Sequence, residues 1–326
     1  MSMHELRPPF PAAVNPREPL VAQHLATRAQ QVSTADRELA AELRKARFER
    51  LISRMYPTAE PRALCGIADI VVWTFLLDDH LDLHRTGHTP GHVDHVQADI
   101  EAALEQHDTT NHQGLLDGWL ASTLRSLEAP DDAWRTRLVE HLRAFTVSQC
   151  TEARAHAFGI MPSVAEYLLQ RRETSGWSVL VDLLELQPGT ALPNSLRSAN
   201  TTERMSTYAG EAASAINDIL SLPKELARGE HHNLVLLIQH HDACTLPNAV
   251  DRVHTYITER TSEYLKSRTK FHDHAAYSSS HMYSTGERFT TGLEHLIRGS
   301  YDWSIDTGRY AAREVEAEPT ITQSRQ

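Results

Sequence analysis

Apolar residues recur at intervals of three and four along most of the chain, a spacing that places them on one face of an α-helix. Leu39, Leu43, Leu51 and Met55 show the pattern between positions 34 and 55, and Thr34 suits the N-cap of that helix. No segment shows a sustained alternation of apolar and polar residues, which is the pattern of a half-buried strand. The sequence therefore predicts an all-α fold.

The same periodicity predicts further helices near residues 64–76, 93–107, 115–127, 134–145, 162–174, 200–222, 250–271 and 293–298. The breaks between them, at 86–91, 159–162, 187–193 and 246–248, are too short to be linkers between domains. We therefore expect one α domain over residues 33–313. The N-terminal segment 1–32, which contains several prolines, and the polar tail 314–326 are expected to be loosely held.

The net charge excludes some classes of partner. The chain carries 32 Lys and Arg against 43 Asp and Glu, a net charge of −11. A field of that sign repels nucleic acid, and an anionic ligand would need metal ions to bind. Cys65, Cys150 and Cys244 form no CxxC pair, which favours reduced thiols and a cytoplasmic location. No apolar run is long enough for a signal peptide or a membrane-spanning helix.

Carboxylates cluster at Asp78, Asp79 and Asp82, where an apolar segment ends. On a helix, Asp82 lies four and three positions after the other two, so the three carboxylates share one surface. Negative charges near a helix C-terminus, expected here near Gly87, oppose the helix dipole unless cations are bound. The motif predicts an acidic rim on a hydrophobic cavity, and a solvated acidic helix end is the alternative.

A second cluster consists of Asn217, Ser221 and Glu225, which are spaced by four residues and line one stripe of the helix expected there. All three offer oxygen atoms, the ligands that Mg²⁺ prefers, whereas Zn²⁺ favours Cys and His. Pro223 lacks an N–H and is expected to kink the helix between Ser221 and Glu225. Together the two clusters indicate a site for a hard divalent cation.

These residues resemble the motifs of the bacterial and fungal class I terpene synthases. Asp78–Asp82 is similar to the family's DDxxD motif, and residues 217–225 match its NSE motif, NDxxSxxKE. Arg309-Tyr310 resembles the C-terminal RY pair. Arg171 lies 46 residues before Asn217, the separation that the family keeps for its diphosphate-sensing arginine, and Thr174 and Ser175 then take the linker and effector places. A weaker likeness is Asn233-Leu234-Val235.

The resemblance implies a class I terpenoid synthase fold, a helical bundle around a central hydrophobic cavity. It also implies a Mg²⁺-dependent lyase that ionises a prenyl diphosphate and cyclises the carbocation. Three Mg²⁺ ions would be held by Asp78, Asp79, Asp82, Asn217, Ser221 and Glu225, although the sequence leaves open whether Asp79 and Asp82 bind metal directly. Diphosphate oxygens would accept hydrogen bonds from Arg171, Lys224, Arg309 and Tyr310.

Farnesyl diphosphate is the expected substrate, with C10 and C20 diphosphates as alternatives, and the oligomeric state, monomer or homodimer, stays open. A carbocation must be kept from water and can be stabilised by aromatic faces. Phe75, which shares a helix face with Asp78, and Trp303 are the candidates for this role, whereas Trp73 and Trp177 are expected in the core.

Three rival interpretations were weighed. A chain-elongating prenyltransferase would carry a second DDxxD motif where residues 217–225 carry NSE instead. A helical protein that binds isoprenoids without turnover would not need both motifs intact. The twenty histidines could suggest a zinc site, but no HExxH or Cys/His ligand spacing frames them. The sequence thus favours a terpene cyclase whose product it does not specify.

Overall fold

The structure, a computed structural model, describes residues 6–33, 37–81, 90–106, 112 and 114–310. Within these ranges it is built of helices joined by turns and loops, without a strand, so the prediction of an all-α fold is confirmed. In chain order the helices are α1 Glu18–Ser33, α2 Arg37–Ala46, α3 Phe48–Met55, α4 Pro61–Leu81, α6 Pro90–Glu105, α7 Leu115–Ser126, α8 Asp132–Ala157, α9 Val164–Thr174, α10 Trp177–Leu184, α11 Asn194–Arg197, α12 Asn200–Arg228, α13 Leu234–His241, α14 Leu246–Ser278 and α15 Ser280–Asp306. None of the described helices has the length and apolar character needed to cross a membrane.

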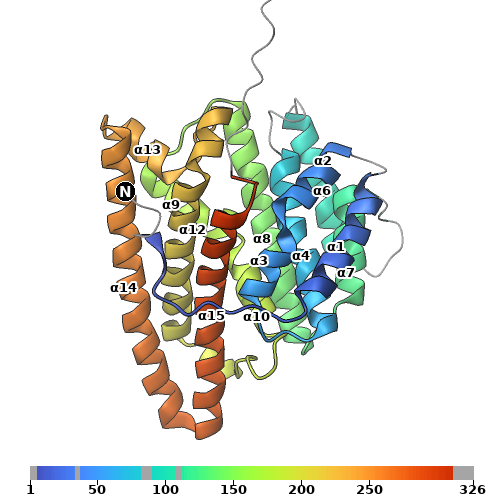
Figure 1. The fold of residues 1–326 in the computed structure, drawn as a ribbon, viewed down its shortest axis with the longest axis vertical. Helices are drawn as coiled ribbons and strands as arrows, with labels where there is room; N and C mark the ends of the chain where they lie inside the picture. The colour runs from blue at the N-terminus through green and yellow to red at the C-terminus, as the bar shows by residue number, and fades with distance from the viewer. Residues whose placement is uncertain (1–5, 34–36, 82–89, 107–111, 113, 311–326) are drawn as a thin grey trace, which may run out of the picture.

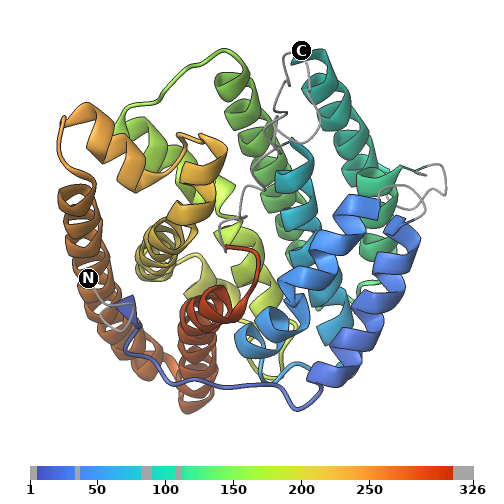
Figure 2. The same ribbon diagram turned by 45° about the horizontal axis from the view of Figure 1, so that its top comes forward.

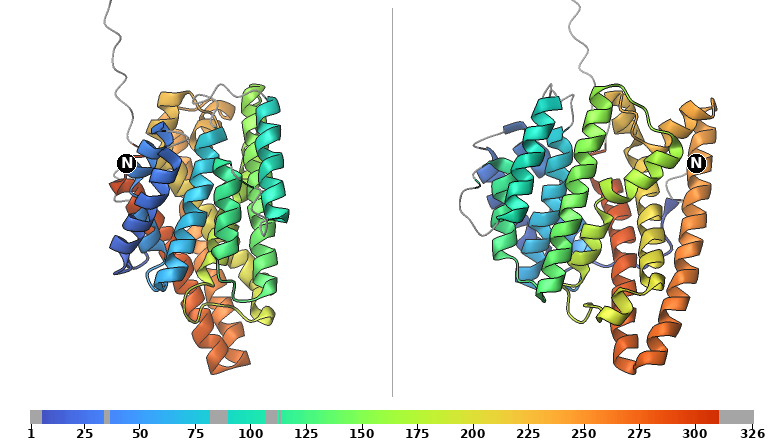
Figure 3. Two further views of the ribbon diagram at one scale, coloured as in Figure 1. Left: turned by 90° about the vertical axis from the view of Figure 1, so that its right-hand side faces the viewer. Right: turned by 180° about the vertical axis from the view of Figure 1, so that it is seen from behind.

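Helix α4 lies in the interior of the bundle, where α1, α3, α7 and α8 pack against it (Figure 1). Its residues 67–73 are all buried, as expected for a helix that is apolar on every side. The indole N–H of Trp73 donates to the carbonyl oxygen of Leu116 at 3.0 Å. The prediction that Trp73 belongs to the core is confirmed. Seen from behind in Figure 3, α6, α7 and α8 lie side by side.

Helix α15 packs between α3 and α12, and α14 runs along α12. In Figure 2 the C-terminal end of α15 (red) lies between α12 (yellow) and the N-terminal helices (blue). Residues 307–310, which follow α15, are thereby brought between the end of α4 and the middle of α12. These are the two places where the sequence puts its acidic and NSE motifs.

The N-terminal segment differs from the prediction that residues 1–32 are loosely held. Residues 18–33 form α1, in which Val21 and Val32 are buried, and Asn15 before it is fully buried. Arg28 donates to both carboxylate oxygens of Asp69 on α4, at 3.0 and 2.8 Å. This ion pair and the small buried Ala29 contribute to the docking of α1, and neither produces an apolar periodicity that can be recognised in the sequence.

The single helix expected over residues 34–55 is divided into α2 and α3. Arg47 between them has a left-handed backbone, with φ of 54°. The carbonyl oxygen of Ala46 accepts hydrogen bonds from Trp303 Nε1 at 2.7 Å and Thr307 Oγ1 at 2.9 Å. In a continuous helix that carbonyl would accept from the N–H of Arg50. Contacts from α15 therefore account for the break.

The helix α12 continues through Pro223 to Arg228. Pro223 therefore does not interrupt the helix, and Ser221 and Glu225 both lie on α12. The predicted cap at Thr34, the predicted helix end near Gly87 and the predicted tail 314–326 lie outside the described residues.

A glycine allows α15 to approach α3 closely. A Cβ added at Gly299 would lie 2.8 Å from the carbonyl carbon of Arg54 and 2.9 Å from the backbone nitrogen of Met55. Gly299→Ala is therefore expected to lower the free energy of unfolding by about 1–3 kcal/mol through overpacking. Gly91→Ala on α6 is the control, because a Cβ there meets nothing within 4 Å. Thermal melts of both variants check this, and equal melting temperatures would contradict it.

Candidate active site

Two consecutive residues after α15 connect the two polar clusters. Arg309 donates from Nη1 to Asp79 Oδ2 at 2.7 Å and from Nη2 to Asp79 Oδ1 at 3.0 Å. The hydroxyl oxygen of Tyr310 accepts a hydrogen bond from Asn217 Nδ2 at 2.9 Å. The end of α4 and the middle of α12 therefore face the same cavity, called here the central cavity, which is lined by Asp78, Asn217, Arg309 and Tyr310 among others.

The carboxylates at the end of α4 differ in their exposure. The side chain of Asp79 is 7% exposed, whereas that of Asp78 is 48% exposed and lies on the wall of the central cavity. Arg309 Nη2 reaches Asp78 Oδ2 at 3.5 Å, so one guanidinium serves both carboxylates. The third predicted ligand, Asp82, lies outside the described residues.

Asn217, Ser221 and Glu225 line one wall of the central cavity, as their spacing predicts. Burial and the negative charge of Asp218 raise the pKa of Glu225 to about 7, against hydrogen bonds from Ser221 and Asn233 that lower it. A carboxyl group in such surroundings favours a nearby cation. The amide, hydroxyl and carboxylate oxygens of this stripe fit a hard divalent metal ion.

Arg171 is held in place against this stripe. Its Nη2 donates to Asn217 Oδ1 and to Asp218 Oδ1, both at 2.9 Å, and Asp218 also accepts from the Tyr167 hydroxyl at 2.8 Å. Burial opposes the charged form of Arg171, but the combined interactions with Asp218, Tyr167, Glu152 and Glu225 outweigh it, so the pKa of Arg171 is raised above its ordinary value. Its Nε is buried without a hydrogen-bond partner and can donate to an anion in the cavity.

Three further predicted residues lie on the cavity wall. Thr174 ends α9, and its buried Oγ1 has no partner. Ser175 follows it and donates to the carbonyl oxygen of Arg172 at 3.2 Å. Lys224 lies on α12, where burial and the positive charge of Arg309 lower its pKa. The central cavity thus contains every predicted diphosphate-binding residue.

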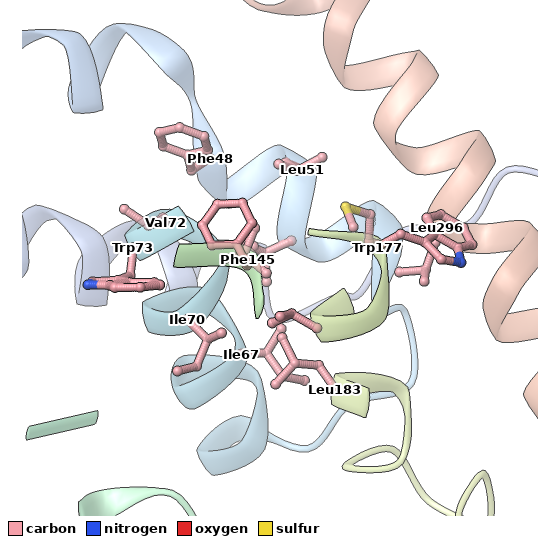
Figure 4. Packing of buried hydrophobic residues seen from close by; sticks show 14 of the residues in the cluster. Phe48, Leu51, Ile67, Ile70, Val72, Trp73, Phe145, Trp177, Leu183 and Leu296 are labelled. Carbon is pink, nitrogen blue, oxygen red and sulfur yellow. The ribbon is translucent and has the colours of Figure 1, made fainter. Parts of the chain in front are cut away.

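The central cavity has a volume of about 250 Å³, and apolar side chains form part of its wall. Figure 4 shows Leu51, Phe145, Trp177 and Leu296, which come from α3, α8, α10 and α15 and gather in one region. All four line the cavity. Trp177 packs in the hydrophobic core, as expected, and its indole also borders this space.

Phe75 and Trp303 lie on the cavity wall, as predicted. Their rings meet edge to face with centroids 5.6 Å apart, and the guanidinium carbon of Arg309 lies 4.9 Å from the Phe75 centroid. The Trp303 N–H is already paired with the backbone. Both rings are therefore fixed by packing, with Phe75 contacting the arginine that holds the acidic motif.

Several residues that shape the site were assigned no role from the sequence. Asp218 anchors Arg171. It is the second residue of the matched NSE motif, and that place in the motif was the sequence signal that could have identified it. Asn233 donates to Glu225 Oε2 at 2.5 Å and to the Asp218 carbonyl oxygen at 2.7 Å. Glu152 on α8 lines the cavity, and burial raises its pKa to about 8 despite the opposing charge of Arg171. No sequence pattern marks Glu152.

Histidines gather beside the central cavity. His156, His231 and His232 line it, and burial lowers the pKa of His232 to about 4. In the part of the chain that the structure describes, no group of three or more His, Cys, Asp and Glu side chains is arranged to hold a metal ion. Asn217, Ser221 and Glu225 on α12 do not form a group of that composition, because two of the three would bind a metal through an amide oxygen and a hydroxyl oxygen.

The geometry agrees with comparisons to known proteins. Residues 69–263 match the family model described as terpene synthase family 2, C-terminal metal binding. The chain is 28% identical over 320 residues to (+)-T-muurolol synthase ((2E,6E)-farnesyl diphosphate cyclizing) from Roseiflexus castenholzii, covering 98% of this chain and 97% of that protein. It is 30% identical to pristinol synthase from Streptomyces pristinaespiralis, over 94% and 84% of the two chains.

Solved structures share the fold. The crystal structure of α-eudesmol synthase matches with a TM-score of 0.80 and 21% identity, over 92% of this chain and 98% of that one. Germacradien-4-ol synthase from Streptomyces citricolor also matches with a TM-score of 0.80, at 22% identity, over 94% and 100% of the chains. The chain therefore belongs to terpene synthase family 2, a metal-binding family, and is an all-α class I terpene synthase.

Proposed function

We propose that this enzyme ionises farnesyl diphosphate with the help of Mg²⁺ and cyclises the resulting carbocation. The observation that carries the proposal is the bridge formed by Arg309 and Tyr310 between Asp79 and Asn217. It brings donors for an anion and oxygen ligands for a cation to the wall of a cavity that also presents apolar and aromatic side chains. The C15 chain length is supported by the Roseiflexus castenholzii relative, which is named as cyclising farnesyl diphosphate.

The metal would be held from two sides. Asn217, Ser221 and Glu225 supply ligands from α12, and the carboxylates at Asp78, Asp79 and Asp82 supply them from the end of α4. Their oxygen chemistry favours Mg²⁺, and three ions are expected from the family resemblance. When bound, the ions neutralise the diphosphate and make it a better leaving group.

The arginines of the site have donors left over for the substrate. Arg171 and Arg309 each have a buried Nε without a hydrogen-bond partner, while their other nitrogens hold Asn217, Asp218 and Asp79. We assign these donors, with Lys224 and the Tyr310 hydroxyl, to the diphosphate oxygens. In the protein without substrate the same arginines neutralise the carboxylates, so that buried negative charge is compensated in both states.

The hydrocarbon chain would lie against the apolar part of the cavity. Phe75 and Trp303 present aromatic rings there, and each face can stabilise a carbocation by about 0.5–2 kcal/mol. Thr174 and Ser175 follow Arg171 directly in the chain. A shift of Arg171 toward diphosphate is therefore transmitted to the cavity wall within one helical turn, which gives these two residues their proposed linking and effector roles.

The proposal is tested by incubating the purified full chain with C10, C15 and C20 diphosphates in Mg²⁺ or in EDTA. We expect diphosphate release and a cyclic terpene from the C15 substrate in Mg²⁺, no turnover in EDTA, and recovery when Mg²⁺ is restored. Turnover in EDTA would contradict the metal assignment. Turnover of only the C10 or C20 substrate would correct the chain length, and binding without turnover would identify an isoprenoid-binding protein.

A further inference from the structure

A second cavity lies behind the wall that carries Arg171. This rear cavity has a volume of about 370 Å³, is partly open to solvent and is lined by residues of α8, α9, α10, α12, α13 and α14. Most of its lining side chains are polar, including Tyr167, Arg172, Glu203, Thr207, Glu211 and Tyr256. The central cavity, whose wall mixes polar and apolar side chains, lies directly beside it.

Four residues border both cavities: Arg171, Ser175, Trp177 and Ser214. They form the partition between the two spaces. Two of them carry hydroxyl groups that donate to backbone carbonyl oxygens, Ser175 to Arg172 at 3.2 Å and Ser214 to Gly210 at 2.8 Å, so each can still accept a hydrogen bond from water. The partition therefore offers acceptors at Ser175 and Ser214 that can hold a water molecule in contact with the central cavity.

The indole of Trp177 closes the remaining part of the partition. Its Nε1 donates to Ser206 Oγ at 3.1 Å, and its ring lies against Gly210, where an added Cβ would be 2.6 Å from the ring carbon Cγ. The ring is thus held on α12 by one hydrogen bond and one close contact. Ser214 lies one turn further along α12, and its hydroxyl donates to the carbonyl oxygen of Gly210 at 2.8 Å.

The rear cavity is suited to water. Waters occupy cavities that are roomy and offer two to four polar partners, and each takes a volume of about 30 Å³ in the liquid. A space of about 370 Å³ can therefore hold on the order of ten. Glu211 is one polar partner, because its side chain is 8% exposed and its buried Oε2 makes no direct hydrogen bond.

We infer that the rear cavity supplies water across this partition to a cyclised carbocation, so that the main product is a cyclic terpene alcohol. The inference rests on the proposed function and specifies its product class. Asp78, Lys224 and Arg309, which are assigned to metal and diphosphate, line only the central cavity, whereas Arg171 belongs to the partition itself. Water held at Ser175 and Ser214 therefore reaches the carbocation from the rear cavity. In the quenching step the water oxygen forms a C–O bond with the cationic carbon. One O–H bond of that water breaks, and the proton passes to a second water and leaves through the rear cavity.

The wild-type enzyme tests the inference directly. It is incubated with Mg²⁺ and farnesyl diphosphate, or with whichever of the three diphosphates it turns over, in water enriched in ¹⁸O. Products are analysed by gas chromatography with mass spectrometry, and diphosphate release is measured in parallel. A main product that is a cyclic alcohol carrying ¹⁸O is the expected result. A hydrocarbon as the main product, or an alcohol without label, would overturn the inference while diphosphate release still supported the proposed function. If no substrate released diphosphate, both the inference about water and the proposed function would be contradicted.

A matched pair of variants tests the route. Ser214→Val fills the partition and removes its hydroxyl, whereas Ser178→Val makes the same change at a residue that lines only the rear cavity. We expect Ser214→Val to lower the ratio of alcohol to hydrocarbon by about fivefold or more, with little change in diphosphate release. Ser178→Val should leave the ratio unchanged. Equal ratios in both variants would show that water enters elsewhere, and the labelling of the wild type decides the product class even if Ser214→Val does not fold.

Discussion

Asn217→Ala is expected to lower the rate of diphosphate release from farnesyl diphosphate by about 10³-fold or more. The amide of Asn217 has three assigned tasks, because it accepts from Arg171, donates to Tyr310 and supplies an oxygen to the metal. A metal ion that acts as a Lewis acid lowers the barrier by several kcal/mol, and each 1.4 kcal/mol corresponds to a factor of about ten in rate. The rate is measured by coupled detection of diphosphate at saturating Mg²⁺.

The control for this variant lies on the same helix. Asn200 is exposed at the start of α12, so Asn200→Ala removes the same amide without touching the cavity. Both variants should keep the helical circular dichroism signal of the wild type and melt within a few degrees of it. If Asn217→Ala kept more than about a tenth of the wild-type rate, the stripe on α12 would not be the metal site.

The stripe on α12 is the part of the site that could be predicted most directly. A spacing of four residues on a helix is sufficient to place Asn217, Ser221 and Glu225 on one wall, because the geometry is local. The structure confirms this placement and shows that Pro223 does not interrupt the helix. The positions of Arg171 and Arg309 beside the same wall came from the resemblance to a family, since no local rule relates residues so far apart.

Other parts of the site were hidden because they depend on contacts between distant helices. Asp218 points to Tyr167 and Arg171 on α9, and which neighbour it would meet cannot be read from α12 alone. Glu152 has no motif, and its raised pKa follows from burial among residues of other helices. The rear cavity exists only where several helices leave space between them, so periodicity and spacing carry no information about it.

In the fold, as in the site, features with local causes could be predicted from the sequence, whereas features that depend on distant contacts could not. Long amphipathic helices such as α8 and α12 were predicted, whereas the break at Arg47 was not. That break follows from hydrogen bonds that Trp303 and Thr307 make to the Ala46 carbonyl across more than 250 positions of the chain. A residue with positive φ that is neither Gly nor Asn gives no sequence signal, so only the tertiary contact accounts for it.

Arg309→Lys is expected to lower kcat/KM for farnesyl diphosphate by about 10- to 100-fold. Lysine keeps the positive charge but provides a point charge in place of a planar fork, so the paired contacts to Asp79 and the diphosphate cannot both be kept. Hydrogen bonds to charged groups contribute about 1.5–3 kcal/mol each, which corresponds to this range of rates. Steady-state kinetics with C15 diphosphate and Mg²⁺ measures the change.

The chain offers a closely matched control elsewhere. Arg28 also donates to both oxygens of a buried aspartate, Asp69, and its guanidinium carbon lies 4.7 Å from the Trp119 ring, much as that of Arg309 lies 4.9 Å from Phe75. Arg28→Lys should therefore disturb the docking of α1 and lower the melting temperature, yet leave kcat/KM within about twofold of the wild type at a temperature where the variant is folded. The same substitution in the same kind of environment then separates stability from function. Equal losses of kcat/KM in the two variants would mean that Arg309 only holds Asp79 and the end of α4 in place, and the diphosphate contacts would have to be assigned to Arg171 and Lys224.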